Sequence, residues 1–165
     1  MPALRYQIVA TGPLFEANIA AIFDQEITAT LRELGLLGQR LVVQASPRGV
    51  SSGGGGLRGS IFTELRGVPG SRSQIISSPL FYAPIVELGR RPGKRPPLAP
   101  ILLWARRKLG QESVHAAWLI ARKIGQRGTT GAFMFRHAYR RLVPVAQAQF
   151  AATAARIADR LGGSK

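Results

Sequence analysis

The sequence contains no cysteine, and this absence excludes two large classes of small protein. Neither a disulfide framework nor a cysteine-based zinc site can be built from it. The 165 residues still suffice for an apolar core. A chain of about 150 residues buries roughly 68–70% of the surface that its unfolded form exposes. We therefore expect one domain spanning residues 1–165.

Long apolar runs are also missing. No run approaches the roughly 18 apolar residues that a membrane span needs. The N-terminus, MPALRYQIVATGP, lacks a cationic start followed by a long apolar stretch, so it does not read as a secretion signal. We expect a soluble protein that is made inside the cell and does not contact a membrane.

Acidic residues are scarce. The chain has 8 Asp and Glu against 23 Lys and Arg, a net charge of +15, and 19 of the basic residues are arginine. From Leu88 to Arg141 there are 13 basic residues and one acid, Glu112, whereas residues 15–33 are net acidic. Such a field favours polyanionic partners. The alternative is that arginine richness follows a GC-rich genome and that the charges lie on solvated faces.

Residues for catalysis or metal binding are few and scattered. His115 and His137 are 22 positions apart and have no carboxylate or thiol at ligand spacing. No serine or threonine stands in a recognisable nucleophile motif. We expect no enzyme, no cofactor and no metal, although a carboxylate pair formed only by folding stays open. His115 is expected to pack beside Trp118, and His137 to lie in a basic cluster.

The order of the patterns predicts an α+β fold: a long N-terminal helix, a small antiparallel sheet, then several C-terminal helices. Leu4–Ala10 reads as a short edge strand, ended by Gly12-Pro13. Apolar residues then recur at helical spacing to Leu34, and the helix is expected to resume over 39–45 after a weak point at 35–38. Ser46-Pro47 should end it.

The middle and end of the chain predict the loop, the sheet and the C-terminal helices of this α+β fold. Residues 47–57 contain four consecutive glycines and predict a flexible loop. GSIFTELRGV and SQIISSP predict a hairpin around GVPGSRS, covered on both faces. A C-terminal helical part over about 98–162 is expected, with stops at Gly110, Gly128 and Gly162 and a kink or break at Pro144. An apolar stripe in its last helix comprises Phe150, Ala154, Ile157 and Leu161.

Two tryptophans lie close to basic clusters. Trp104 precedes ARRK and Trp118 precedes LIARK. Stacking on nucleic-acid bases is one interpretation, and packing in the core of each helix is the one we favour. No base-reading motif is present, so any contact with DNA should use backbone charge. The DNA-facing candidates are Arg106, Arg107, Lys108, Arg136, Arg140 and Arg141.

Glu87 is a single carboxylate in the apolar stretch SPLFYAPIVELG, which the basic loop 89–97 follows at once. A charged group in such a setting is costly unless it is paired. We therefore expect a structural carboxylate that accepts backbone or arginine hydrogen bonds at a strand-to-loop corner.

Three segments resemble one protein family. ASPRGVSSGGGGLRGSI, FYAPIVELGRRPGKRPP and RGTTGAFMFRHA are similar, in the same order, to segments of the tail-completion or head-tail joining proteins of long-tailed bacteriophages, including the lambdoid minor tail protein Z type. With the elements around them they cover roughly Gln39 to the C-terminus. The chain departs from the family at Ser51-Ser52, where a threonine-glycine pair is usual, and at Arg90, where a threonine is frequent.

The resemblance implies a small α+β virion protein without enzymatic activity. It would form a ring, expected to be a hexamer, that joins the tail to the head connector around the passing genome. Its partners would be copies of itself, the adjacent head-closure or connector protein, and the tail terminator or tail tube. It would be assembled in the host cytoplasm.

The two irregular segments, 47–57 and 89–97, are expected to reach a neighbouring subunit. The predicted assembly residues are Leu57, Arg58, Ser60, Ile61, Tyr82, Val86, Glu87, Gly89, Arg90, Arg91, Lys94 and Arg95. The alternatives are a free-standing basic DNA-binding protein and a tail terminator or other minor tail protein.

Overall fold

The computed structural model describes residues 19–48, 56–110 and 113–162, apart from the side chain of Lys108. The fold is α+β, as predicted. In chain order the elements are α1 Ile19–Ala45, α2 Gly56–Ser60, β1 Phe62–Val68, β2 Ser71–Ser77, α3 Ala83–Leu88, β3 Gly89–Arg90, α4 Leu98–Leu109, α5 Val114–Arg127, β4 Thr129–Thr130 and α6 Met134–Gly162.

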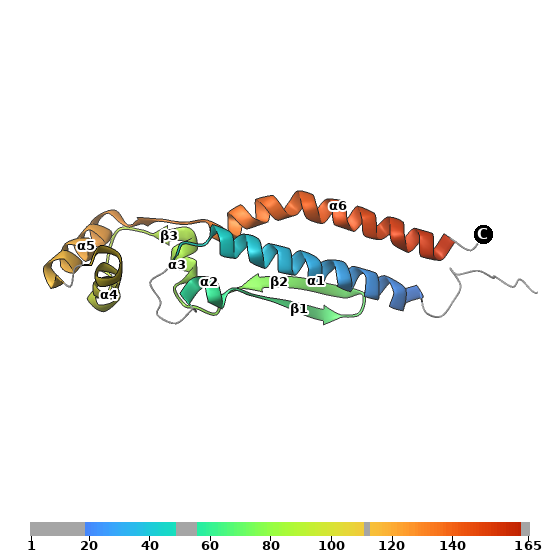
Figure 1. The fold of residues 1–165 in the computed structure, drawn as a ribbon, viewed down its shortest axis with the longest axis horizontal. Coiled ribbons are helices and arrows are strands. Elements are labelled where there is room, and N and C mark those ends of the chain that lie inside the picture. The colour runs from blue at the N-terminus through green and yellow to red at the C-terminus, as the bar shows by residue number, and fades with distance from the viewer. Residues whose placement is uncertain (1–18, 49–55, 111–112, 163–165) are drawn as a thin grey trace, which may run out of the picture.

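The body of the protein has three layers with α1 in the middle. The antiparallel helix α6 packs along one side of α1, and the β1–β2 hairpin packs along the other (Figure 1). The main core lies where the C-terminal half of α1 meets α2, α3 and the start of α6. Its buried residues are Leu41, Val42, Leu57, Ile61, Ala83, Met134 and Ala138.

Helix α1 runs unbroken through Gly35 and Gly38, so the predicted weak point at 35–38 is wrong. Glycine inside a helix costs roughly 1 kcal/mol relative to alanine, but both glycines are buried under the hairpin. A Cβ on Gly35 would lie closer than 3.0 Å to Gln74, and one on Gly38 would overlap Ile76. The close packing that the glycines permit therefore outweighs their low helix propensity. The predicted end at Ser46-Pro47 is confirmed.

The hairpin is present, but it differs from the prediction in two respects. Its turn contains only Pro69 and Gly70, because the ladder extends from Phe62 opposite Ser77 to Val68 opposite Ser71. It is covered on one face only: no strand residue is fully buried, and Phe62 and Val68 are 40% and 66% exposed. The low polarity of the strands therefore does not reflect burial on both sides in this chain.

Helix α6 is also continuous, and Pro144 does not break it. The predicted stripe is partly wrong. Ile157 and Leu161 are buried, but Phe150 is 36% exposed, because α6 is turned so that Thr153 faces α1. The hydroxyls of Thr153 and Thr30 are hydrogen-bonded at 2.7 Å across the interface. A polar pair thus occupies a position where the sequence suggested an apolar one.

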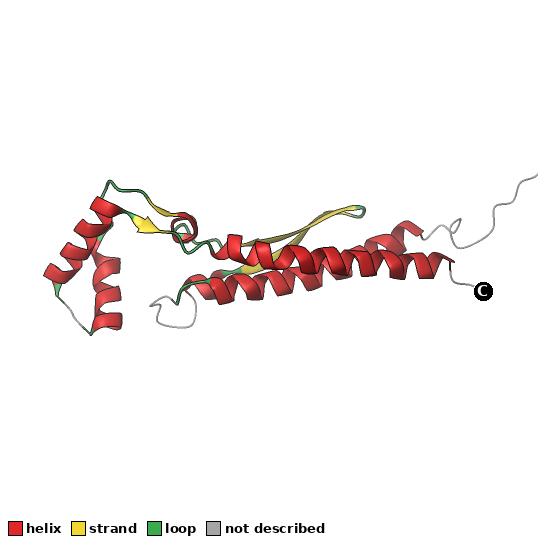
Figure 2. Cartoon of the chain, turned by 90° about the horizontal axis from the view of Figure 1, so that it is seen from above, coloured by secondary structure: helices red, strands yellow, loops and turns green. Residues whose placement is uncertain are grey.

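Helices α4 and α5 form a separate unit at the end of the molecule opposite the C-terminus (Figures 1 and 2). They have their own small core of Ile101, Ala117 and Ala121. Gly110 and Gly128 end the two helices with positive φ, as predicted. Residues 98–162 therefore do not form one helical part, since β4 separates this unit from α6.

Some predictions fall outside the described residues. These are the strand Leu4–Ala10, its end at Gly12-Pro13, and residues 49–55 of the first loop. The described end of that loop is helical, because α2 begins at Gly56. The second loop is also shorter than predicted, since Gly89 and Arg90 form β3 and pair with β4.

Candidate functional site

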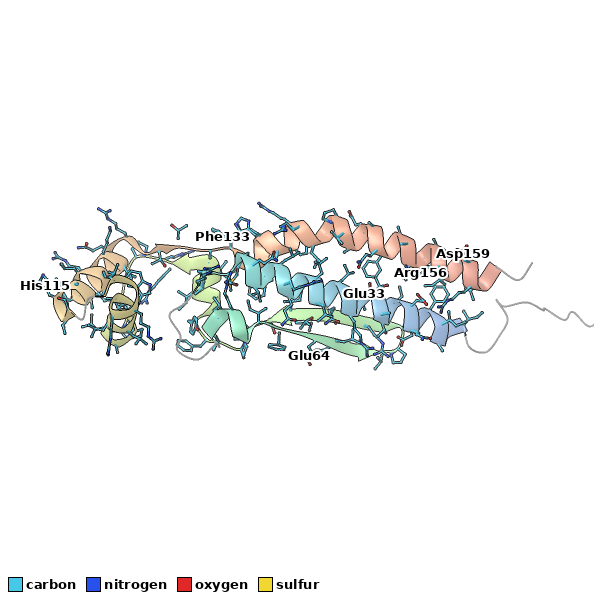
Figure 3. The ribbon with its side chains drawn as sticks, in the orientation of Figure 1. Glu33, Glu64, His115, Phe133, Arg156 and Asp159 are labelled. Atoms are coloured by element: carbon cyan, nitrogen blue, oxygen red, sulfur yellow. The ribbon has the colours of Figure 1, made fainter. Side chains whose placement is uncertain are left out.

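Segments far apart in the sequence meet at one place, which we call the central joint. It consists of the C-terminal end of α1, α2, α3, the β3–β4 pair and the first turn of α6 (Figure 1). Phe133, at the start of α6, lies there (Figure 3). Residues 45–61, 81–97 and 127–138 each contribute to this joint.

Glu87 binds the N-terminal end of α6. Its two carboxylate oxygens accept hydrogen bonds from the backbone N–H groups of Phe135 at 2.9 Å and Arg136 at 3.1 Å. The first N–H groups of a helix have no partner within the helix, and the helix dipole favours a negative charge beside them. The predicted backbone hydrogen bonds are therefore present. The predicted position is wrong, because Glu87 lies in the last turn of α3 and not at the end of a strand.

The backbone around Glu87 is bound to the same segment. The N–H groups of Ala132 and Phe133 donate to the carbonyls of Val86 and Glu87 at 2.7 and 3.0 Å. Phe133 has a φ of 49°, a left-handed conformation that costs a non-glycine residue roughly 1–2 kcal/mol. The hydrogen bonds of Ala132, Phe133 and Phe135 to α3, on either side of Phe133 in the chain, hold it in that conformation.

Four predicted assembly residues stabilise the chain's own fold. Leu57 and Ile61 are 5% and 3% exposed and belong to the main core. Arg58 donates to the carbonyls of Ser46 and Gln44 at the end of α1, and Ser60 is hydrogen-bonded to Ser78. Cationic side chains favour the C-terminal end of a helix. The side chains of these four residues are engaged within the chain, and their role at a subunit interface stays a prediction.

Helix α3 carries an apolar surface that the sequence analysis missed. Tyr82 and Val86 pack against the main core, as half-buried residues. Phe81, Ile85 and Leu88 are 87%, 44% and 64% exposed. Ile85 and Leu88 are three residues apart and share one side of α3, and Phe81 lies in the turn just before the N-cap Tyr82. We call these three residues the α3 stripe; the spacing of Ile85 and Leu88 was the signal that could have identified its helical part.

The second functional region is the basic end, which comprises residues 91–128. It includes α4, α5 and the irregular segment that leads into them. Gly93 donates to the carbonyl of Gly125 at 2.7 Å, and Arg90, just before the basic end, donates to that of Lys94 at 2.8 Å. The irregular segment is therefore bound to α5. Arg91 and Lys94 have exposed side chains.

The two tryptophans are not core residues. Trp104 is 40% exposed. The half-buried Trp118 lies between two guanidinium groups, with Arg95 at 5.3 Å and Arg122 at 5.5 Å from the ring centroid. His115 stacks on Trp118 at 6.5 Å, as predicted. The core interpretation failed because Ala117 and Ala121, which let the helices approach closely, occupy the interior instead.

The candidate DNA-facing residues fall into two groups. Arg106, Arg107 and Lys108 are on α4 in the basic end, whereas Arg136, Arg140 and Arg141 are on the first turns of α6. Arg136 lies over the Phe133 ring at 4.6 Å. His137 is exposed between these arginines on α6, as predicted. The two groups are separated along the chain by α5 and β4.

Asp24, Glu26 and Glu64 in the body are paired with arginines. Asp24 accepts two hydrogen bonds from Arg72, at 2.8 and 2.9 Å, and one from the N–H of Gly70, which fixes the hairpin turn to α1. The hydrogen bond from Arg72 holds the pKa of Asp24 below its ordinary value, although partial burial acts in the opposite direction. This pair therefore adds stability at neutral pH that is lost as the pH falls through the folded-state pKa.

Two further carboxylates show the same pattern. Glu26 is bound by Arg160 at 2.7 Å and Arg156 at 3.4 Å. The exposed Glu64 is paired with Arg66, and that hydrogen bond lowers the pKa of Glu64. Within the described ranges, no group of three or more His, Asp and Glu side chains could hold a metal ion. These carboxylates are arranged to bind arginine.

An open groove of about 1100 Å³ lies between the N-terminal half of α1 and the hairpin turn. Alanines 20, 21 and 29, Phe23 and Ile27 provide much of its surface. The Asp24–Arg72 ion pair lies on one side, and exposed Arg32 adds a further cationic group to the lining.

The architecture makes a clear prediction for the basic end. Arg90 pairs with Thr129, so β3 and β4 already face each other in hairpin register. Replacing residues 91–128 by Asn-Gly, the preferred two-residue turn, should leave the body folded, because the basic end contributes no residue to the main core. Urea unfolding should give a free energy of unfolding within about 1 kcal/mol of the full chain. Loss of cooperative unfolding would show that the two cores depend on each other.

None of the helices in the described part of the chain is long and apolar enough to cross a membrane. Comparison of the chain with models of protein families, with characterised proteins and with solved structures gave no match.

Proposed function

We propose that this protein is a structural subunit of the neck or tail of a bacteriophage. In this proposal it forms a ring that completes the tail and joins it to the head connector, and the genome passes through its channel. Its neighbours are the head-closure or connector protein and the tail terminator or tail tube. The subunit acts by shape and surface, without a reaction centre.

One observation carries the proposal: the three segments that resemble phage tail-completion proteins meet at the central joint. Leu57, Ala83 and Met134, one from each segment, share the main core, although Leu57 and Met134 are 77 positions apart in the sequence. Glu87 from the second segment binds the start of α6 in the third. Segments that build one structural joint are expected to be retained together in order, so the resemblance and the geometry support the same family.

The exposed apolar surfaces also support an assembling subunit. The α3 stripe lies beside the central joint, and Phe62 and Val68 are exposed on the hairpin. Large exposed apolar residues that gather on one surface mark sites of protein contact. A ring subunit has two different contact surfaces, one for each neighbour. The α3 stripe and the open face of the hairpin are two such surfaces.

The basic end favours a second candidate function, that of a free-standing protein bound to nucleic acid. The two functions differ in their assembly. A ring subunit forms a closed oligomer of fixed copy number without nucleic acid, whereas a free-standing protein does not.

Native mass spectrometry and negative-stain electron microscopy of the purified full chain test the proposed function. We expect a ring with a single copy number. The variant Phe81→Asp/Leu88→Asp should remain folded but monomeric, because a charge in the α3 stripe would be buried unpaired at the contact.

Val114→Asp is the matched control, since Val114 is 61% exposed and begins α5, where an acidic residue is tolerated. It should form rings like the unmodified chain. A chain that stays monomeric at every concentration, or rings that persist in the α3-stripe variant, would contradict the proposed assembly.

A further inference from the structure

The two parts of this protein differ in their balance of acidic and basic residues. The basic end, residues 91–128, has nine Lys and Arg and one acid, Glu112, a net charge of +8. All six acidic residues in the described ranges lie in the body: Asp24, Glu26, Glu33, Glu64, Glu87 and Asp159. Figure 3 shows Glu33, Glu64 and Asp159 along the body and His115 on the opposite end. The described body has twelve arginines and is also net positive, at +6, but the basic end carries +8 on far fewer residues, so its density of positive charge is higher.

The basic end does not support the fold of the body. Its apolar interior is confined to α4 and α5, and it joins the rest of the chain through the short β3–β4 pair. Helices α4 and α5 lie almost wholly between the second and third segments that carry the proposed resemblance, which end at Pro97 and begin at Arg127. Because the unit contributes no residue to the main core, we look for its role in the residues on its surface.

That surface holds cationic groups in place. Arg95 comes from the irregular segment and Arg122 from α5, and both guanidinium groups lie over the Trp118 ring. A guanidinium stacked on an aromatic ring is already restricted, so it loses less conformational freedom when it binds a phosphate. Arg107, Lys123 and Arg127 are exposed on the two helices.

The arrangement favours nucleic acid over a membrane surface. A helix that lies on a membrane separates its apolar side from its basic side. Here the two are mixed, since exposed Leu103 is four residues from Arg107, and exposed Leu119 is four residues from Lys123, on the same faces. Arginine interleaved with aromatic residues, without a base-reading motif, is typical of contact with a phosphate backbone.

We propose that the basic end binds the phosphate backbone of double-stranded DNA without reading its sequence. This inference deepens the proposed function, since it assigns the contact with the passing genome to α4 and α5. It does not require the ring, because the charges belong to a single chain.

The test measures the affinity of the full chain for a fluorescent random-sequence duplex as a function of salt. Each phosphate contact contributes about −0.9 to the slope of log K against log salt concentration. In the variant Arg107→Gln/Lys123→Gln/Arg127→Gln we expect a slope that is shallower by up to about 2.7 and a proportional loss of affinity at low salt. A slope that is shallower by about 0.9 or more, which corresponds to the loss of at least one phosphate contact, supports the proposal.

The matched control is Arg32→Gln/Arg40→Gln/Arg48→Gln, which removes the same charge from exposed positions of the body. It should keep the slope of the unmodified chain. If the triple variant of the basic end fails to fold, the variant with Asn-Gly in place of 91–128 takes its place and should lose most of the binding. Equal losses in the body control, or no binding of the full chain at about 50 mM salt, would overturn the proposal.

Two further measurements separate the outcomes. Tighter binding to phosphatidylserine vesicles than to the duplex, at equal phosphate concentration, would overturn the choice of DNA. Native mass spectrometry of the same samples reports ring formation independently. Rings without DNA binding would contradict only this inference, and DNA binding by a monomer would contradict only the proposed function.

Discussion

Replacing Gly131 by alanine is expected to destabilise the protein by about 3 kcal/mol or more. The backbone of Gly131 lies directly against the backbone where α3 ends and β3 begins. A Cβ at this position would lie closer than 3.0 Å to the backbone of Glu87, Leu88 and Gly89. Backbone atoms cannot move aside as the end of a flexible side chain can. The two segments would have to separate, which weakens the hydrogen bonds of Ala132 and Phe133 to α3 and the β3–β4 pair.

Gly70→Ala is the control for this prediction. Gly70 has a φ of 82° in the hairpin turn, but a Cβ there would meet nothing within 4 Å. It should cost only the left-handed conformation of alanine, about 1–2 kcal/mol. Urea unfolding monitored by circular dichroism gives both values. If Gly131→Ala cost no more than Gly70→Ala, the close approach at the central joint would not be required for stability.

The parts of the fold that the sequence predicted are those set by neighbouring residues. Ser46-Pro47 ends α1, and glycines with positive φ end α4 and α5, because each signal acts through its own backbone. The hairpin was predicted for the same reason. The packing of distant segments could not be predicted in this way. Gly35 and Gly38 were interpreted as a weak point of the helix. Their contribution to stability comes from close packing against Gln74 and Ile76, which the sequence around them does not show.

The candidate site shows the same division. The cost of an unpaired charge was sufficient to predict that Glu87 is structural. Its partners could not be named, because Phe135 and Arg136 lie 48 and 49 positions further on. Trp118 was assigned to the core from the helical pattern alone. The guanidinium of Arg95 lies over the Trp118 ring. Arg95 belongs to an irregular segment, so no helical or strand periodicity could predict this contact.

Internal contacts and exposed apolar side chains divide the predicted assembly residues and their neighbours. Leu57, Arg58 and Ile61 hold α2 against α1. The large exposed apolar residues of the second segment form the α3 stripe. A motif in a small structural protein thus combines residues that build the joint with residues that face outward.

The second large effect is expected at Glu87, whose carboxylate is the partner of two backbone N–H groups at the start of α6. Glu87→Ala removes both hydrogen bonds and the favourable charge at the helix end. Each hydrogen bond to a charged group contributes about 1.5–3 kcal/mol, and an N-terminal cap about 0.5–2 kcal/mol. We expect a loss of about 2–3 kcal/mol in the free energy of unfolding, since water can reach part of the site.

Glu87→Gln should lose about 1–2 kcal/mol, because an amide offers only one acceptor and places an NH₂ group opposite the second N–H. Glu64→Gln is the matched control, since it removes only the exposed ion pair with Arg66 and should cost clearly less than Glu87→Gln. Urea unfolding ranks the variants. Ring formation, measured on samples that remain folded, then distinguishes a structural Glu87 from an interface residue: a ring lost at unchanged stability would place Glu87 at a subunit contact and contradict its role as the cap of α6.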